Sequence, residues 1–205
     1  MLEIERNIFQ IFPINIFVEQ QFLSEEHCDL ILESIKDKKT HKHNLIGGDG
    51  VSSYNLNDNF SGIFERLPKP INDIREKIQE RIDYFTDVSK MHRCRLGYSW
   101  FNVQNEDSRL HLHSHGFSIV SGALYINIDE SSSSLDFLNP NYSVFSGNYT
   151  DGNVCVVSNR FERGTLVIFP SYLVHGNLKS SNHSKNRVVI SFNTDPVFDL
   201  TSKIT

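Results

Sequence analysis

The apolar positions of the first ninety residues follow a helical spacing in two segments. The first segment begins at Ser24, a favourable N-cap, and its apolar positions are Cys28, Ile31, Leu32 and Ile35. The second follows Pro68 and Pro70, and its apolar face consists of Ile71, Ile74, Ile78, Ile82 and Phe85. Because one face of the second segment is apolar and the other is charged, we expect a helix that covers one side of a sheet.

After about residue 91 the helical spacing gives way to short runs typical of strands. These runs are RLGYSWFNVQ, FSIVSGALYINI, LDFL, NVCVV, GTLVIFP and RVVISFN. An earlier run, residues 8–22, predicts one or two short strands interrupted at Pro13. Helices followed by a series of strands predict an α+β fold, a β-sandwich or barrel backed by N-terminal helices. We expect a single domain over 1–205, with 1–90 as support and 91–200 as the β core.

Composition narrows the class of protein. The chain has 205 residues, 39% hydrophobic and 22% charged, with a net charge of -5, which fits a soluble globular protein and argues against a nucleic-acid partner. No secretory signal and no apolar run long enough to span a membrane are visible, so we expect no membrane contact. The unpaired spacing of Cys28, Cys94 and Cys155 favours reduced thiols and a cytoplasmic protein, in the host cytoplasm if a phage encodes it. A homodimer stays open, since sheet edges or the N-terminal helices could pair.

Three histidines alternate in the segment RLHLHSHGFS, at His111, His113 and His115. Alternate side chains of an extended segment share a face, so either neighbouring pair could chelate one metal ion. The other interpretation is a polar strand face exposed to water. The pattern alone leaves both open.

A distant histidine and arginine extend this pattern. His175 follows the predicted strand of GTLVIFPSYLVHGN, and a barrel would bring that strand beside the alternating histidines as a third ligand. In NRVVISFN, Arg187 shares a face with Val189, Ser191 and Asn193, where its guanidinium could pair with a carboxylate inside the barrel. An exposed loop histidine and an exposed strand-end arginine are the alternatives.

The run SGALYIN predicts a polar face inside the same barrel. Its alternation places four side chains on one face: Ser121, Ala123, Tyr125 and Asn127. Inside a barrel this face would line a pocket, and outside it would face water.

In this order and spacing the motifs resemble those of the 2-oxoglutarate/Fe(II)-dependent oxygenases, in particular a small branch of putative enzymes common in marine bacteria and their phages. The resemblance covers about residues 95–195. It is carried by the segment from His113 to Tyr125, by FPS-x-x-x-H ending at His175, by R-x-x-I-S-F-N starting at Arg187, and by W-x-N at Trp100 to Asn102.

The resemblance implies a double-stranded β-helix (jelly roll, cupin-like) and iron held by His113, His115 and His175, with His111 as the runner-up ligand. It implies that Arg187 pairs with 2-oxoglutarate and that Tyr125 lies along it, and we assign Ser191 and Asn193 to the same co-substrate site. The expected substrate pocket consists of Trp100, Asn102, Ser121 and Asn127. The implied activity is hydroxylation with Fe(II), 2-oxoglutarate and O2.

One departure from the family pattern keeps a second function open. The superfamily usually supplies an Asp or Glu where this chain has a histidine, so the charge of Fe(II) stays uncompensated until 2-oxoglutarate binds. The alternative is a cupin-like protein that binds a metal or a small acid without 2-oxoglutarate turnover. The substrate, a small molecule or a peptidyl residue, is not specified by the sequence.

Overall fold

The computed structural model describes residues 13–56, 62–69, 71–141 and 155–197. Its helices are α1 (Glu25–Ile35), α2 (Ile74–Val88) and a short 3-10 helix, η1 (Phe64–Arg66). Its strands are β1 (Phe17–Glu19), β2 (Ile46–Gly47), β3 (Gly50–Ser52), β4 (Cys94–Gln104), β5 (Arg109–Leu110), β6 (Val120–Asn127), β7 (Leu135–Leu138), β8 (Val156–Asn159), β9 (Leu166–Pro170), β10 (His175–Gly176) and β11 (Arg187–Pro196).

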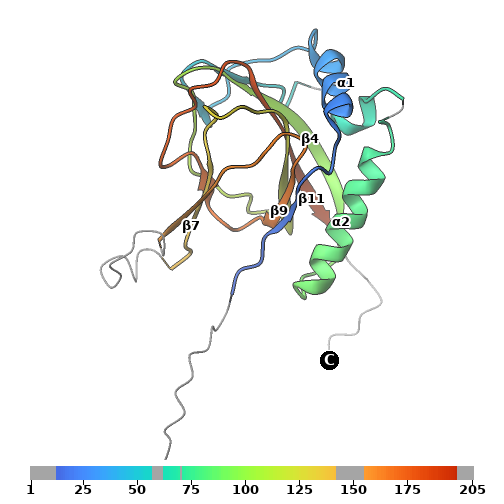
Figure 1. The fold of residues 1–205 in the computed structure, drawn as a ribbon. Helices are drawn as coiled ribbons and strands as arrows, with labels where there is room; N and C mark the ends of the chain where they lie inside the picture. Colours follow the sequence, from blue (N-terminus) through green and yellow to red (C-terminus); the bar gives the residue numbers. More distant parts are fainter. Residues whose placement is uncertain (1–12, 57–61, 70, 142–154, 198–205) are drawn as a thin grey trace, which may run out of the picture.

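The strands form one large sheet and two small ones. The six-stranded sheet has the order β1-β9-β6-β11-β4-β3, and the three-stranded sheet has the order β10-β7-β8. A two-stranded sheet joins β2 to β5, and every paired strand is antiparallel to its neighbour. Figure 1 shows α1 and α2 on one side of the large sheet and β7 on the other. The predicted α+β class, with N-terminal helices packed on one face, is confirmed.

Both helices form where the apolar spacing predicts them. The Ser24 hydroxyl caps α1 by accepting a hydrogen bond from the backbone N–H of His27 at 3.2 Å. In α2, Ile74, Ile78 and Ile82 are at most 1% exposed, because this face packs against β4. Among the described residues, neither helix is long and apolar enough to span a membrane.

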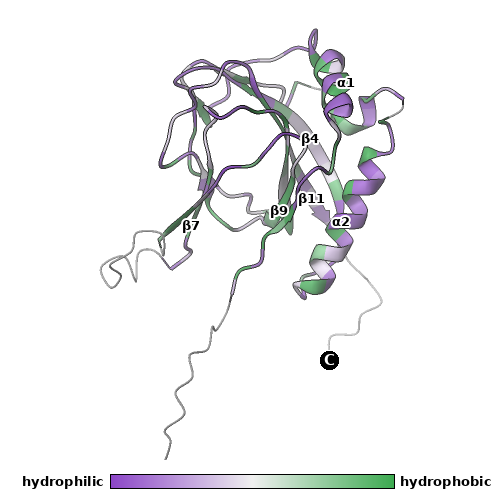
Figure 2. Ribbon diagram, in the orientation of Figure 1, coloured by the Kyte–Doolittle hydropathy of each residue, from purple (hydrophilic) through white to green (hydrophobic). Residues whose placement is uncertain are grey.

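The strands β6 and β9 and most of β11, in the middle of the large sheet, bury both of their faces, which explains the long apolar runs in the sequence (Figure 2). The face toward the helices carries Leu124, Ile126, Leu166, Ile168, Val188, Ile190 and Phe192, and these side chains share one core with α1 and α2. The opposite face carries Ala123, Tyr125, Val167, Phe169 and Val189, which pack with Leu135 and Phe137 of β7. The second face forms the inside of the barrel.

A buried carboxylate of β7 fixes the chain that follows β10. Asp136 is fully buried, and its Oδ2 accepts the backbone N–H groups of Leu178 at 2.6 Å and Lys179 at 2.7 Å. Its Oδ1 accepts the Ser134 hydroxyl at 2.7 Å. Burial raises the pKa of Asp136, but these hydrogen bonds outweigh burial and hold the pKa below its usual value. Asp136 therefore anchors the turn beyond His175 as a charged acceptor.

Replacing Asp136 with alanine is expected to lower the free energy of unfolding by about 3 kcal/mol, because two backbone N–H groups and a hydroxyl lose a charged acceptor. Urea unfolding of the metal-free protein measures this change. Asp37 is exposed and forms none of these bonds, so Asp37→Ala should change the stability by less than about 0.5 kcal/mol. Equal stabilities of the two variants would contradict the anchoring role.

Candidate metal centre

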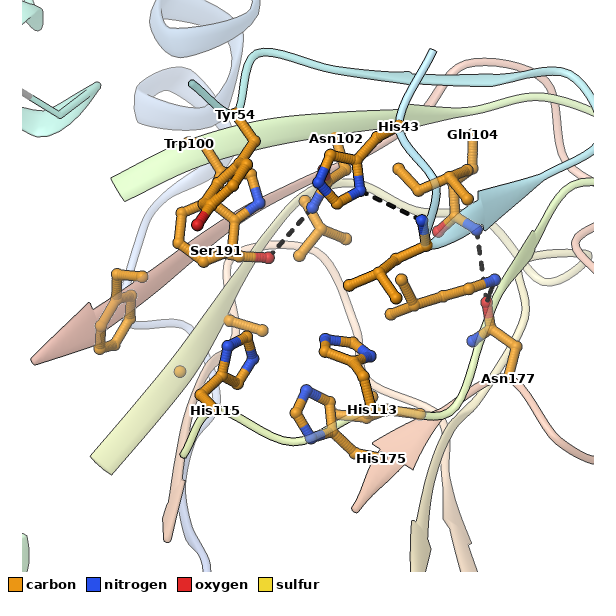
Figure 3. Close-up of a pocket in the computed structure, with 18 of the residues that line it drawn as sticks. His43, Tyr54, Trp100, Asn102, Gln104, His113, His115, His175, Asn177 and Ser191 are labelled. Atoms are coloured by element: carbon orange, nitrogen blue, oxygen red, sulfur yellow. Dashed lines mark hydrogen bonds between the residues drawn. The ribbon is translucent and has the colours of Figure 1, made fainter. Parts of the chain in front are cut away.

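Three histidine side chains converge inside the barrel, beside β10 at the edge of the three-stranded sheet. One ring nitrogen from each of His113, His115 and His175 lies within 4.8 Å of the other two. The ring centroids are 4.4 Å apart for His113 and His175, 4.9 Å for His113 and His115, and 5.2 Å for His115 and His175. Figure 3 shows the three imidazoles facing one another. The structure thus brings together residues that are some sixty positions apart in the sequence.

Backbone hydrogen bonds hold the two segments side by side. The N–H of His113 donates to the carbonyl of His175 at 3.0 Å, and the N–H of His175 donates back to the carbonyl of His113 at 2.9 Å. The N–H of His115 donates to the carbonyl of Ser171 at 2.8 Å. The histidine segment is therefore an extended connection with an isolated bridge at His113, and it is not a continuous strand.

Two of the rings have a defined tautomer. Nδ1 of His113 lies 2.8 Å from the carbonyl oxygen of His111, and Nδ1 of His175 lies 2.9 Å from that of Leu173. Since a carbonyl oxygen can only accept, both Nδ1 atoms carry the proton and both Nε2 atoms keep a free lone pair. This arrangement is the one that metal-binding histidines usually have.

The third ring has a side-chain partner. Nδ1 of His115 lies 3.3 Å from Nδ2 of the Asn193 amide, which donates to it in this orientation, and Oδ1 of the amide accepts the Ser121 hydroxyl at 2.8 Å. Ser121 also shares a hydrogen bond of 2.8 Å with Ser171. With the amide turned over, Oδ1 of Asn193 accepts the Nδ1 proton of His115, and Ser121 then accepts from the amide nitrogen. That orientation frees Nε2 of His115 for a metal ion.

The histidines are electrically suited to bind a cation. Burial, assisted by the neighbouring His113, lowers the pKa of His115 to about 4. Burial and the same neighbour lower the pKa of His175 to about 3, and burial lowers the pKa of His113. All three rings are thus neutral near pH 7, which is the protonation state that coordinates metals.

His111, the runner-up ligand, lies outside this group. Among the described residues, the cluster that could hold a metal ion contains His113, His115 and His175. His111 is exposed, and its ring lies next to Gly47, where an added Cβ would be 3.1 Å from Nε2. Its contribution to the site is the backbone carbonyl that orients His113.

Arg187 lies in the same cavity as the histidines. Its side chain is buried, its guanidinium carbon is 5.7 Å from the centre of the Tyr125 ring, and one terminal nitrogen donates to Oε1 of Gln104. Nε is buried without a hydrogen-bond partner, and no carboxylate of the described residues forms an ion pair with the guanidinium. Burial accordingly lowers its pKa from the ordinary value. A buried cation of this kind fits an anionic ligand.

The cavity between Arg187 and the histidines has a volume of about 310 Å³. It is lined by Tyr125, Ser191, Trp100 and Asn102, as the sequence predicts for the co-substrate and substrate sites. Asn102 donates a hydrogen bond to the Ser191 hydroxyl at 3.1 Å, which joins β4 to β11 across the cavity wall (Figure 3). Burial raises the pKa of Tyr125 to about 12, so its phenol keeps its proton.

Three predicted pocket residues lie elsewhere. Asn127 is not among the lining residues, because a register shift in the pairing of β6 with β11 places Tyr125 opposite Val189 but Asn127 opposite Val188. This bulge turns Asn127 toward the other side of the sheet, where it donates to the Asn186 carbonyl at 2.7 Å. Ser121 and Asn193 also lie outside the lining residues, and they support His115.

Two further cavity residues, His43 and Tyr54, come from a segment to which the sequence analysis assigns no role. His43 lines the cavity, and its ring packs edge-on against Tyr54 with centroids 5.2 Å apart. Tyr54 in turn packs edge-on against Trp100 at 4.9 Å. Burial, together with His41, lowers the pKa of His43. No local motif marks these residues, since only the folding of 41–55 over the barrel brings them to the cavity.

The lining residues carry a single permanent charge. They include no aspartate or glutamate, and Arg187 is their one lysine or arginine. Among the described residues, therefore, no other acid of the cavity lining replaces the carboxylate ligand that the family pattern would supply.

Comparison with known proteins agrees with this geometry. A family described as putative 2OG-Fe(II) oxygenase matches residues 98–193, which include all three clustered histidines and Arg187. Among curated proteins, none matches this chain in sequence. The predicted resemblance to these oxygenases is confirmed, and its assignment to a branch of marine bacteria and phages stays a prediction.

Solved structures with the same fold are distant in sequence. HygX from Streptomyces hygroscopicus, with nickel and 2-oxoglutarate bound, has a TM-score of 0.60 at 10% identity, over 90% of this chain and 84% of that chain. A prolyl-4-hydroxylase of Pseudomonas putida has a TM-score of 0.60 at 12% identity, over 90% and 94% of the two chains. The viral collagen prolyl hydroxylase of Paramecium bursaria Chlorella virus-1, as a 2OG complex, has a TM-score of 0.55 at 13% identity, over 89% and 96%. The predicted double-stranded β-helix is confirmed.

Proposed function

Because residues 98–193 match the family of putative 2OG-Fe(II) oxygenases, we propose that this chain hydroxylates an organic substrate with Fe(II), 2-oxoglutarate and O2. The observation that carries the proposal is the shared cavity of three neutral histidines and one buried arginine, for which the described residues provide no anionic partner. Such a cavity offers a cation site and an anion site in one enclosed space, where a 2-oxo dicarboxylate could bind both.

The metal site would consist of Nε2 of His113, His115 and His175, which suits Fe(II) as a borderline cation that binds imidazole well. When bound, iron and its co-substrates supply the oxidation, in which a substrate C–H and O2 become C–OH while 2-oxoglutarate becomes succinate and CO2. The carbonyls of His111 and Leu173 keep two of the rings oriented. Asn193 performs the same task for His115.

The co-substrate would lie between the histidines and Arg187. The guanidinium can hold the distal carboxylate of 2-oxoglutarate through two donors, and the Tyr125 ring beneath it excludes water from the pair. The Ser191 hydroxyl lies on the same face and can donate to the same ligand. These assignments extend to this chain the 2-oxoglutarate named for HygX and for the viral hydroxylase.

The substrate would enter from the aromatic side of the cavity. His43, Tyr54 and Trp100 form a wall whose rings are neutral and whose polar tips can donate hydrogen bonds. We propose a small molecule or a peptidyl residue as the substrate, with no role for nucleic acid. A free thiol at each of Cys28, Cys94 and Cys155 supports the further proposal that the protein acts in the cytoplasm.

Anaerobic titration tests the proposed function. Adding 2-oxoglutarate to the Fe(II)-loaded protein should produce a visible charge-transfer absorption, and admitting O2 with ascorbate should then produce succinate. Absence of both signals from a protein that binds Fe(II) would overturn the proposal.

The cavity's lack of acidic residues favours one second candidate, a cupin-like protein that binds a metal or a small acid without turnover. Metal analysis of the purified protein distinguishes the two functions. Bound zinc or nickel, with no charge-transfer absorption after exchange to Fe(II), would support the binding protein.

A further inference from the structure

Behind Arg187 lies a chain of two neutral side-chain amides. Oε1 of Gln104 accepts a hydrogen bond from a terminal nitrogen of Arg187, and Nε2 of Gln104 donates to Oδ1 of Asn177 at 3.3 Å. Asn177 continues the chain, because its Nδ2 donates to the backbone carbonyl of Ser134. Gln104 and Asn177 are both at most 2% exposed. Figure 3 shows the two amides together on the side of the cavity away from Trp100 and Tyr54.

The direction of this chain is fixed by a backbone donor. Oδ1 of Asn177 accepts the N–H of Leu110 at 2.8 Å, so the oxygen of this amide must point toward Leu110 and Gln104. The nitrogen of the Gln104 amide must then face Asn177, which leaves its oxygen facing Arg187. The orientation of Gln104 therefore follows from the backbone of β5.

Gln104 holds the guanidinium without neutralising it. The two residues are direct partners in the pairing of β4 with β11, so the contact is short and both backbones are fixed. A glutamate at this place would form a buried ion pair with Arg187 and satisfy its charge from within the protein. The neutral amide occupies one donor and leaves Nε without a partner, so the charge stays available.

We propose that Gln104 is a positioning residue that aims Arg187 at the dicarboxylate co-substrate and, by being uncharged, sets the affinity for it, while Asn177 keeps the Gln104 amide in the required orientation. The proposal rests on the proposed function, since it assigns Arg187 to 2-oxoglutarate. The same amide chain connects the arginine to the metal site, because Asn177 follows the metal-site residue His175 by two positions. The backbone N–H of Asn177 also donates to the Leu110 carbonyl at 2.8 Å.

The test compares Gln104→Glu with Gln104→Met in the nickel-loaded protein, titrated with N-oxalylglycine by calorimetry. Glutamate preserves the shape of glutamine, whereas methionine loses its hydrogen bonds. A purely structural role predicts that Met is the more harmful change. The proposal predicts the opposite order, with a loss of affinity of about 10-fold for Met and about 100-fold or more for Glu. Nickel affinity, measured before the co-substrate analogue is added, should stay within about 3-fold of wild type in both.

Each outcome of this comparison has a defined meaning. Glu binding as tightly as wild type, or more tightly than Met, overturns the proposal. If the methionine variant does not fold, Gln104→Ala takes its place, since it also removes the amide and adds no charge. A wild-type protein that binds nickel but not N-oxalylglycine would instead overturn the proposed function, so the two failures are distinguishable.

Discussion

Replacing His175 with alanine is expected to lower the affinity for a divalent metal ion by about 100-fold or more and to abolish succinate formation. The reason is geometric, because His175 supplies one of the three clustered ring nitrogens, and among the described residues no acidic side chain lines the cavity to replace it. Calorimetric titration of the metal-free protein with Mn(II) or Ni(II) measures the affinity directly, independently of turnover.

His111 offers a matched control for this prediction. It belongs to the same histidine-rich segment, but its ring is exposed and lies outside the cluster. The variant His111→Ala should bind metal within about 3-fold of wild type, because the backbone carbonyl that orients His113 is retained. A large loss in His111→Ala together with full binding in His175→Ala would show that the metal site is assembled differently.

The second large effect is expected for Arg187→Met. This change should weaken binding of 2-oxoglutarate by about 100-fold, the effect of losing two charge-assisted hydrogen bonds to a carboxylate. The charge-transfer absorption of the anaerobic Fe(II) protein, followed as 2-oxoglutarate is added, gives the dissociation constant. Metal binding itself should stay close to wild type, since Arg187 is not among the clustered ligands.

For the stability of the ligand-free protein, Arg187→Met is expected to have no harmful effect, in contrast to its effect on 2-oxoglutarate binding. Methionine removes a buried cation that no carboxylate of the described residues pairs with. The midpoint urea concentration for unfolding of the ligand-free variant should therefore equal or exceed that of the wild type. Arg187→Met that lost stability while binding 2-oxoglutarate normally would assign the arginine a purely structural role.

Local patterns were sufficient to predict the helices and the two faces of the strand at 187–193. The spacing of Ile74, Ile78 and Ile82 depends only on helix geometry, and all three are buried as expected. The alternation of Arg187 with Val188 depends only on strand geometry, and their side chains lie on opposite faces. Such predictions succeed because they need no knowledge of which elements become neighbours.

The failure at Asn127 has a specific cause. Alternation places it on the face of Tyr125, but the bulge opposite Val188 and Val189 reverses the faces beyond that point. A bulge adds one residue to one strand of a pair, so it exists only in the relation between two strands. The sequence of β6 alone contains no sign of it.

The residues that the sequence analysis missed share this dependence on register. Gln104 faces Arg187 because β4 and β11 pair at that position, and Asp136 reaches Leu178 and Lys179 because β7 lies beside β10. Both are ordinary polar residues in short apolar runs. Their roles become visible only when strands far apart in the sequence are placed next to each other.

The reciprocal backbone pair between His113 and His175 means that the ligands are assembled by folding and not by metal capture. The conformational entropy lost in bringing the two chain segments together is lost whether or not an ion is present. Chelation should therefore yield a folded apoprotein, unlike small zinc domains that unfold without their metal. In hydrogen exchange, the backbone amides of these two residues should remain protected in that apoprotein. Such protection would show that the metal site is preorganised before the ion binds.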